Sequence, residues 1–406
     1  MLTKKRKMIG MRFCNIPINT SEIPQTDLNI AEKNRSNLFT WNGQFSPQFV
    51  EAELTKYADK NYIVLDPFAG SGTTLYESAR KNLLAYGIEL NPSAYYMAKI
   101  YELVTADMVE RNRLIKHIDK LVCKIKNTDN ILNVLTDYAK SDDHYSVKNV
   151  LSTLIILMDI YKNEVTFELV VNKWGELKNT ILELPFSNRP ICVSNGDARK
   201  TSLKTDLVDL VLTSPPYINV FNYHQNYRKS VEALGYNVLE IAKSEFGANR
   251  KHRGNRFLTV IQYCIDIALS LKEASRICKD KARMIYVVGR ESTVLGYSFC
   301  NSELIYRIGT EILGFEFDIR QERVFKNRYG HMIYEDILHF INKKNNSKDK
   351  NDIQSTARNI AVEMLLDRYN SIKNNKNAEL ILDAIHKSNH VNTSEVLLCE
   401  EHTAKK

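Results

Sequence analysis

Short apolar runs, each followed by a polar or acidic residue, recur near both ends of the chain and indicate buried strands. The first three runs end at or just before Asp66, Glu89 and Asp197. A fourth ends in two prolines, which cannot continue a parallel ladder. The strands expected from this pattern are 62–65, 83–88, 191–193, 208–212, 284–288, 315–325 and 336–341.

Between these runs the apolar residues recur every three or four positions, which is the period of an amphipathic helix. Ser46 and Pro47 suit the N-cap and first turn of one such helix, and 257–278 and 302–313 show the same spacing. Strands that alternate with helices predict an α/β fold. We therefore expect a doubly wound, mostly parallel seven-stranded sheet with an antiparallel edge hairpin.

The stretch between the second and third strands has a different character. It lacks the strand pattern, and Leu114, Ile118 and Leu121 recur at helical spacing between lysines and arginines. We expect a helical insertion that either recognises a target or supports the sheet. The expected organisation is an N-terminal arm at 1–30, a main α/β domain at 31–100 and 191–342, the insertion at 101–190, a charged linker at 343–352 and a helical C-terminal tail at 353–406.

The composition indicates the cellular compartment of the protein more than it indicates the function. A formal net charge of +8 is compatible with a polyanionic partner but does not identify one. The seven cysteines form no CxxC pair and no cysteine–histidine metal spacing, so we expect a reducing compartment and no metal. No apolar stretch is long enough to cross a membrane, and no signal-peptide core follows the basic residues at 4–7, which predicts a cytoplasmic protein.

The first strand leads into a glycine turn that suits the close approach of a ligand. From Asp66 the sequence reads Asp-Pro-Phe-Ala-Gly-Ser-Gly-Thr-Thr, and its glycines permit a tight turn from strand to helix. It lacks the lysine of a P-loop and the third glycine of the dinucleotide fingerprint. Glu89 follows at the next strand end, where a carboxylate can accept both hydroxyl hydrogens of a ribose. With Asp197, three strand-end acids fit the polar groups of a nucleoside.

The fourth strand ends in Thr-Ser-Pro-Pro-Tyr, residues 213–217, at the carboxyl edge of the sheet, where open α/β folds bind ligands. Because proline has a carbonyl but no N–H, this corner presents hydrogen-bond acceptors that suit a substrate amino group. The Tyr217 ring can stack on a planar heterocycle, and the Ser214 hydroxyl can give or accept a further hydrogen bond.

Two other stretches add candidates. Residues 37–45 hold three aromatic side chains, which form either plain core or the wall of a small-molecule pocket. After the proline corner, aromatic, basic and glycine residues suit a flexible loop that grips phosphate. His224 in this stretch is a candidate acid or base by composition alone. The candidate residues for contacts with a nucleic acid are Tyr223, Arg228, Arg250, Lys251, Arg253 and Arg256.

The glycine turn and the Thr-Ser-Pro-Pro-Tyr corner, found together in one chain, resemble the motifs of the amino-type DNA methyltransferases that use S-adenosylmethionine. The resemblance covers roughly residues 37–341 apart from the insertion, and it implies a Rossmann-like class I methyltransferase fold. It implies a catalytic site formed by Ser214, Pro215, Pro216 and Tyr217. The cofactor-binding residues that it implies are Trp41, Phe45, Asp66, Phe68, Gly70, Gly72, Thr73, Glu89 and Asp197.

Within that set, the resemblance assigns the methionine and sulfonium part of the cofactor to Phe68, Gly70 and Gly72. It assigns the ribose to Glu89 and the adenine amino group to Asp197. Many family members with Ser-Pro-Pro-Tyr have the catalytic motif before the cofactor motif, whereas this chain has the reverse order. The insertion, the basic loop at 243–256 and the tail are therefore all candidates for target recognition.

In this family Ser-Pro-Pro-Tyr goes mainly with N4 of cytosine, and Asp-Pro-Pro-Tyr or Asn-Pro-Pro-Tyr mainly with N6 of adenine. We therefore expect methylation of N4 of a flipped cytosine in double-stranded DNA, within a restriction-modification system that includes a cognate endonuclease. N6-adenine methylation is the first alternative, followed by RNA or protein amide methylation and by a catalytically silent DNA-binding subunit. Carbon-5 methylation is disfavoured because no Pro-Cys nucleophile occurs in the sequence.

Overall fold

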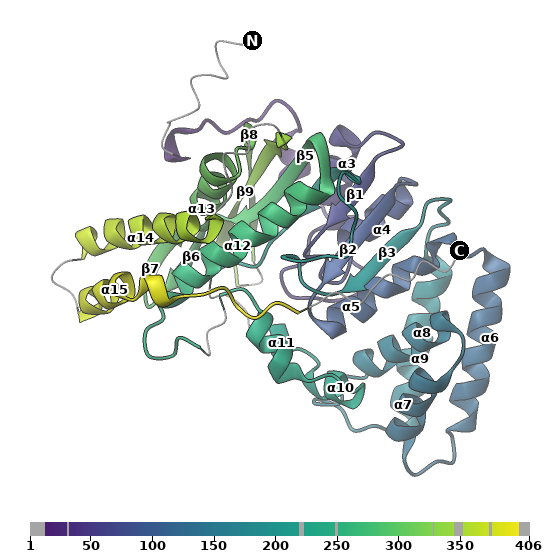
Figure 1. Cartoon of the computed structure of the whole chain (residues 1–406). Coiled ribbons are helices and arrows are strands. Elements are labelled where there is room, and N and C mark those ends of the chain that lie inside the picture. Colours follow the sequence, from purple (N-terminus) through teal and green to yellow (C-terminus); the bar gives the residue numbers. More distant parts are fainter. Residues whose placement is uncertain are drawn as a thin grey trace.

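The structure is a computed structural model of the chain and describes residues 13–30, 32–218, 223–247, 251–327, 329–344, 352–372 and 376–397. Figure 1 shows a central sheet with helices on both faces and a further group of helices, blue to teal, below it. Among the described residues, no helix is long and apolar enough to cross a membrane.

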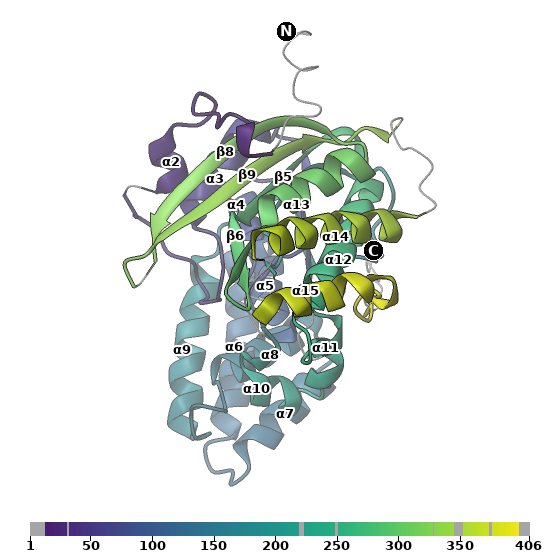
Figure 2. The same cartoon turned by 90° about the vertical axis from the view of Figure 1, so that its left-hand side faces the viewer.

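Seven strands form the sheet, in the order β3-β2-β1-β4-β5-β9-β8. The first five pair in parallel, whereas β9 runs antiparallel to both β5 and β8, so the reversed strand lies one place inside the edge (Figure 2). The predicted doubly wound, mostly parallel fold is confirmed. The strands are β1 (Ile63–Asp66), β2 (Leu84–Glu89), β3 (Ile191–Asn195), β4 (Val208–Thr213), β5 (Cys278–Gly289), β8 (Glu316–Lys326) and β9 (Met332–Ile341).

Alternating side chains of the central strands supply two separate cores. In β4, Leu210 and Leu212 pack on one face of the sheet, and Val211 packs on the other. Because both faces are buried, the strand has three consecutive apolar residues, Leu210–Leu212. Helices α3 (Pro47–Tyr57), α4 (Thr73–Arg80) and α5 (Pro92–Lys99) cover the first face, and α12 (Leu258–Ile277), α13 (Asn301–Arg307), α14 (Ile353–Ser371) and α15 (Lys376–His386) cover the second.

The predicted helical insertion packs against α5 on the first face of the sheet. Arg111 fastens the insertion at both ends, because its buried guanidinium donates to the carbonyls of Leu103 and Val104 at the entry and of Leu184 and Pro185 at the exit. Its helices are α6 (Met108–Lys124), α7 (Ile131–Ser141), α8 (Tyr145–Leu157) and α9 (Phe167–Glu183), preceded by the 3-10 helix η2 (Ile100–Thr105).

The N-terminal segment was expected to be an arm of uncertain order, and its described part lies against the edge strand β8. The backbone of Ile18 forms a bridge with Arg320, and the Asn19 N–H donates to the Arg320 carbonyl at 2.6 Å. The Arg320 guanidinium lies over the Phe13 ring. The segment therefore covers backbone groups that an edge strand leaves unpaired. Its short helices are η1 (Phe13–Asn15) and α2 (Gln25–Asn29).

Several short elements complete the chain. The sequence pattern missed the two-stranded sheet that follows β5, and the last turn after α13 is a π-helix. The remaining elements are η3 (Tyr223–Gln225), α10 (Arg228–Ala233), α11 (Val238–Ser244), β6 (Glu291–Val294), β7 (Tyr297–Cys300), η4 (Ile308–Ile312) and η6 (Ser388–His390). From Val391 the chain is extended and runs beside the end of α11, where the Glu395 N–H donates to the Lys243 carbonyl.

Candidate active site

A pocket lies at the carboxyl ends of β1, β2, β3 and β4 and brings together most of the residues expected for cofactor binding and catalysis. Gly72 and Pro215 are neighbours of lining residues but do not line the pocket themselves. The predicted residues that line it are Trp41, Phe45, Asp66, Phe68, Gly70, Thr73, Glu89, Asp197, Ser214, Pro216 and Tyr217.

The glycine turn between β1 and α4 requires glycine for both conformation and space. Gly70 and Gly72 have positive φ angles of 52° and 90°, which side chains rarely adopt. A Cβ on Gly72 would lie 2.7 Å from the Tyr101 ring, and one on Gly70 would lie 3.3 Å from Trp41. The bare backbone of Gly70 therefore lines the pocket directly.

Glu89, at the end of β2, fastens this turn. Its carboxylate accepts hydrogen bonds from the N–H groups of Gly70 and Asn91, each at 2.7 Å. Burial raises the pKa of Glu89 to about 7, although these bonds act in the opposite direction. Each carboxylate oxygen has two lone pairs, so Glu89 can also accept hydrogen bonds from ligand hydroxyl groups.

Asp66 joins the two sequence motifs. Its Oδ1 accepts hydrogen bonds from the Phe68 N–H at 3.1 Å and from the Thr213 hydroxyl at 2.6 Å. Burial raises the pKa of Asp66 to about 6, opposed by its hydrogen bonds. Because Thr213 directly precedes Ser214, one carboxylate links the glycine turn to the proline corner. The two motifs therefore lie on the adjacent strands β1 and β4, at the same edge of the sheet.

The proline corner is held by residues from α12 and β5. The Tyr263 hydroxyl donates to the Pro216 carbonyl at 2.8 Å. The Tyr217 ring packs against Gly289, where a Cβ would lie 2.7 Å from the ring. Ser214 Oγ lies 3.3 Å from the Tyr217 hydroxyl, and burial raises the pKa of Tyr217 above its ordinary value. The tyrosine therefore stays neutral and fixed at the pocket wall.

Of the three aromatic side chains before α3, Trp41 and Phe45 line the pocket and Phe39 does not, and all three belong to the hydrophobic core, so each of the two interpretations holds in part. Trp41 is stacked with Tyr223 and Tyr227, at ring-centroid distances of 6.2 and 6.5 Å. The Gln44 Oε1 accepts hydrogen bonds from the Trp41 N–H and the Ser71 hydroxyl, both at 3.0 Å. These bonds fix the aromatic segment to the glycine turn.

The residues expected to contact DNA do not form one group. Tyr223 lines the pocket, and Arg228 pairs with Glu232 of the same helix at 2.8 Å. Lys251 and Arg253 are exposed, and Arg256 is half-buried. Arg250 lies outside the described residues.

One wall of the pocket comes from residues that the sequence pattern did not single out. Ile241, Glu245, Phe246 and Gly247 line it, although 243–256 was interpreted as a basic loop. Glu245 accepts the backbone N–H of His224 at 2.7 Å, and the Nδ1 of that buried histidine lies 2.8 Å from the same carboxyl group. His224 therefore fastens the wall. The adjacent Phe246 and Gly247 were the feature of the sequence that could have indicated this pocket wall.

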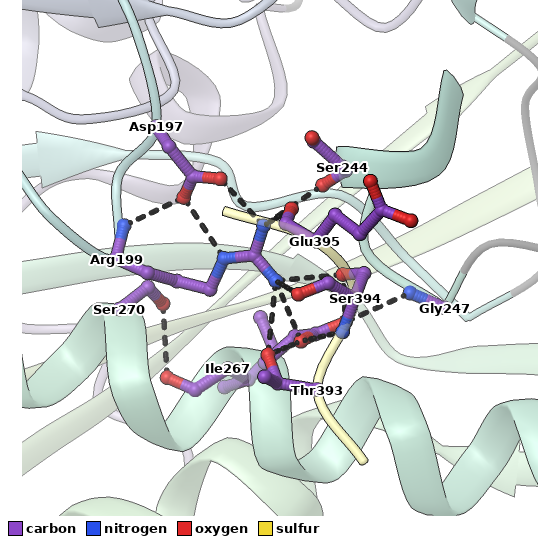
Figure 3. Close-up of polar contacts among 10 residues, drawn as sticks. Asp197, Arg199, Ser244, Gly247, Ile267, Ser270, Thr393, Ser394 and Glu395 are labelled. Carbon is purple, nitrogen blue, oxygen red and sulfur yellow. Dashed lines mark hydrogen bonds and ion pairs between the residues drawn. The ribbon is translucent and has the colours of Figure 1, made fainter. Parts of the chain in front are cut away.

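Asp197 lines the pocket just after β3, and its carboxylate is bound by Arg199. Its Oδ1 accepts hydrogen bonds from the Arg199 N–H and Nε, both at 2.9 Å, and its Oδ2 accepts one from Nη2 at 2.5 Å. Figure 3 shows this arginine between Asp197 and the C-terminal segment. The side chain of Asp197 is thus held in a fixed orientation.

The charge of the pocket lining restricts its ligands. Asp66, Glu89, Asp197 and Glu245 all line it, and no lysine or arginine is found among its described lining residues. Asp197 is paired with Arg199 and Glu245 contacts His224, so the negative charge of the lining comes mainly from Asp66 and Glu89, and it favours a ligand with positive charge and opposes one with phosphate groups. Among the residues that the structure describes, no three histidine, cysteine or acidic side chains are grouped to hold a metal ion. The lining suits a nucleoside that carries a cation.

Comparison with known sequences gives matches over part of the chain. Residues 14–100 match the sequence profile of a family described as DNA methylase. Over 145 residues the chain is 26% identical to the type II methyltransferase M.MjaII of Methanocaldococcus jannaschii. That alignment covers 29% of this chain and 27% of the relative, so the chain spans about a quarter of the relative's length.

Comparison with solved structures finds methyltransferases of low sequence identity. A SAM-dependent methyltransferase from Methanosarcina mazei has a TM-score of 0.34 and 11% identity, over 72% of this chain and 97% of that one. TrmN from Thermus thermophilus has a TM-score of 0.33 and 13% identity, over 74% and 50% of the two chains. TYW2 from M. jannaschii, in complex with AdoMet, has a TM-score of 0.32 and 12% identity, over 78% and 81%.

Proposed function

We propose that the chain is an S-adenosylmethionine-dependent amino-type DNA methyltransferase, as the profile match of residues 14–100 suggests, and that it methylates the exocyclic N4 of a flipped cytosine. The observation that supports this proposal most is that both motifs line the same pocket. A hydrogen bond from the Thr213 hydroxyl to Asp66 connects the two motifs. A methyl donor at the glycine turn and a base at the proline corner would then be neighbours.

The lining fits S-adenosylmethionine by its chemistry. The cofactor carries positive charges on its sulfonium and amino groups and no phosphate, which suits a pocket lined by Asp66 and Glu89 and by no lysine or arginine among its described lining residues. Glu89 would accept the ribose hydroxyls, the loop at Asp197 would bind the adenine, and Phe68 would lie at the methionine end. The bare backbone of Gly70 permits close approach. When bound, the cofactor supplies an electrophilic methyl group.

The proline corner would prepare the base for the reaction. An exocyclic amino nitrogen is a weak nucleophile because its lone pair is delocalised into the ring. Ser214 and the Pro215 carbonyl would accept its two hydrogens while Tyr217 stacks on the base. The nitrogen would form a bond to the methyl carbon while the bond between that carbon and the sulfonium sulfur breaks, so that S-adenosylhomocysteine leaves. The nitrogen would then lose one proton to water, so positioning replaces a strong general base. Extruding the base from the duplex costs about a few kcal/mol, which pocket contacts offset.

We propose cytosine and not adenine as the target because the first residue of the Ser-Pro-Pro-Tyr motif is a serine, Ser214, which in the amino-type family goes mainly with N4 of cytosine. Double-stranded DNA is the proposed partner: the chain carries a net charge of +8 although its pocket is acidic, and Lys251 and Arg253 are exposed. A restriction-modification system with a cognate endonuclease is the proposed setting. Methylation of adenine N6 is the alternative within the same pocket.

The proposal is tested by expression in a methylation-deficient host and mass spectrometry of nucleosides from its DNA. We expect N4-methylcytosine, and N6-methyladenine would establish the alternative. Ser214→Ala should lower the rate of methyl transfer by about 100-fold or more while cofactor binding is retained, because it removes one acceptor for the amino group. Methyl groups found in RNA or protein but never in DNA would reject the proposed substrate.

A further inference from the structure

A buried ion cluster connects the pocket with the extended C-terminal segment 391–397, which we call the C-terminal strap. At its centre the Arg199 guanidinium lies between two carboxylates, with Nη2 at 2.5 Å from Asp197 and Nη1 at 2.7 Å from Asp266 of α12. All three side chains are almost fully buried. Figure 3 shows the cluster, with the strap drawn in yellow.

The strap supplies much of the remaining hydrogen bonding of this cluster. Arg199 donates to the Ser394 hydroxyl at 2.6 Å, to the Thr393 hydroxyl at 3.0 Å and to the Glu395 carbonyl at 2.7 Å. The Ser394 hydroxyl in turn donates to Asp266 at 2.6 Å, and its backbone N–H donates to the same carboxyl at 3.0 Å. Ser394 thus bridges the arginine and the second carboxylate, and it is itself buried.

The opposite side of the cluster holds residues of the pocket. Arg199 donates to the Ser244 carbonyl at 3.1 Å, and its guanidinium lies over the Phe246 ring at 4.8 Å. The Gly247 N–H donates to Asp266 at 3.3 Å. Phe246 also meets the Phe68 ring edge-on at 5.4 Å. Both walls of this end of the pocket, at Asp197 and at 246–247, therefore depend on one guanidinium and one carboxylate.

Burying the Arg199 guanidinium between Asp197 and Asp266 is energetically costly. A buried arginine between two carboxylates needs well-placed hydrogen bonds to offset the loss of water, and its planar fork bonds several partners only in one orientation. Without the strap hydroxyls, Arg199 and Asp266 would lose partners that hold that orientation. The first effect would be a less ordered pocket wall, because Asp197, Phe246 and Gly247 contact the same two side chains.

We propose that the C-terminal strap is a functional part of the cofactor site: Thr393 and Ser394 hold the positioning residues Arg199 and Asp266, which set the pocket wall at Asp197 and 246–247 for S-adenosylmethionine. This inference rests on the proposed function. The strap acts on cofactor affinity and not on the methyl-transfer step, because none of its residues lines the pocket near Ser214.

The test compares the Thr393→Val/Ser394→Ala double variant with Glu395→Gln in the full chain. Glu395 adjoins the same contacts, but it contributes its carbonyl to Arg199 and its side chain is 66% exposed, so its substitution leaves the cluster intact. The dissociation constant of S-adenosylhomocysteine is measured by calorimetry. We expect it to rise about tenfold in the double variant, through the lost hydroxyl bonds, and to stay within about twofold of wild type in the control.

Steady-state kinetics separate positioning from general damage. The double variant should raise the KM for S-adenosylmethionine by the same factor and leave kcat at saturating cofactor within about twofold. Arg199→Lys should behave in the same way, because an ammonium keeps the charge but cannot bond Asp197, Ser244 and the strap together. Ser394→Ala alone serves as a milder variant should the double substitution prevent folding.

The possible outcomes separate a failure of the strap proposal from a failure of the proposed function. A wild-type protein that binds S-adenosylhomocysteine, together with a folded variant whose dissociation constant is unchanged, overturns the role of the strap alone. A fall in kcat without a change in affinity also overturns it. A wild-type protein that does not bind the compound rejects the cofactor and the strap together, whereas binding without DNA methylation rejects the DNA substrate alone.

Discussion

Two acidic side chains of the pocket, Glu89 and Asp66, have pKa values raised toward neutrality. Burial raises the pKa of Glu89 to about 7 and that of Asp66 to about 6. A positively charged ligand favours the ionised form of a carboxyl group, so ligand binding and proton release are coupled. The pH range in which the pocket becomes fully charged is therefore the range in which its affinity should change.

We expect the affinity for S-adenosylhomocysteine to fall as the pH is lowered from about 8 to about 6, because Glu89 takes up a proton and loses acceptor capacity. Calorimetry across this range measures the effect. Glu89→Gln should bind more weakly at pH 8 and lose most of the pH dependence, leaving a smaller change from Asp66. A wild-type dissociation constant that is flat over this range would contradict the role of Glu89.

The side chains that sequence alone could place are those at strand ends. Asp66, Glu89 and Ser214 follow apolar runs directly, and parallel strands bring their carboxyl ends to one edge. The contact of Arg199 with Ser394 could not be found in this way, because the two residues are separated by 195 positions and belong to no local pattern. Long-range polar contacts depend on tertiary packing that periodicity does not encode.

Among the helices, α3 carries a charged residue on its buried face. Glu53 is fully buried, and neither of its carboxyl oxygens has a hydrogen-bond partner among the described residues. Burial raises the pKa of Glu53 to about 8, although the positive charge of Arg283 acts in the opposite direction. The helix is therefore packed best against the sheet when this carboxyl group is protonated.

This burial predicts a pH dependence of stability. The unfolded chain releases the Glu53 proton near pH 4.5 and the folded chain near pH 8, so the free energy of unfolding should fall as the pH rises between these values, by at most about 1.4 kcal/mol per pH unit. Glu53→Gln should reduce this slope, as measured by denaturant unfolding at several pH values. Glu51→Gln, on the same helix but half-exposed, should leave the slope unchanged.

The elements differ in how well their sequences revealed them. The strands β1, β2, β4 and β8 and the helix α12 were predicted within about one residue of their observed bounds, because the apolar residues of each follow a strand or helix pattern. The predicted bounds of β5 and β9 were too short, because their first residues are mostly polar or exposed. The hairpin of β6 and β7 was missed. Its strands are four residues each, and its turn uses Leu295 and Gly296 at φ angles of 49° and 87° without the Asn-Gly or Asp-Gly signal of a hairpin.

Over the whole molecule, the net charge is positive, whereas the charged residues that line the described pocket are acidic. The chain has a net charge of +8, whereas the described pocket lining has four carboxylates and no basic side chain. A polyanion would therefore be attracted to the outer surface while the pocket admits a cation. Lys251 and Arg253 precede α12, whose first residues lie at the carboxyl edge of the sheet, since β5 begins directly after the helix.

If DNA binds at that edge, Lys251→Ala/Arg253→Ala should weaken DNA binding and reduce the slope of log K against log salt by about 2, through two lost phosphate contacts. Fluorescence anisotropy with duplex DNA at several salt concentrations measures the slope. Lys60→Ala/Lys272→Ala removes the same charge from exposed residues at the opposite edge and should leave the slope nearly unchanged. Equal effects of the two double variants would contradict this binding surface.

The position of Arg111 also has a consequence for the evolution of the chain. Because one guanidinium bonds the carbonyls at both ends of the inserted helices, the points where the chain leaves and rejoins the α/β domain are neighbours. β2 and β3 pair directly across this joint. We expect that helices of another length or sequence, grafted between the same two points with an arginine at the place of Arg111 and an apolar face against α5, would leave the β2–β3 register and the acids at its end in place. Under these two conditions this region of the molecule should be exchangeable as a module while the pocket is kept.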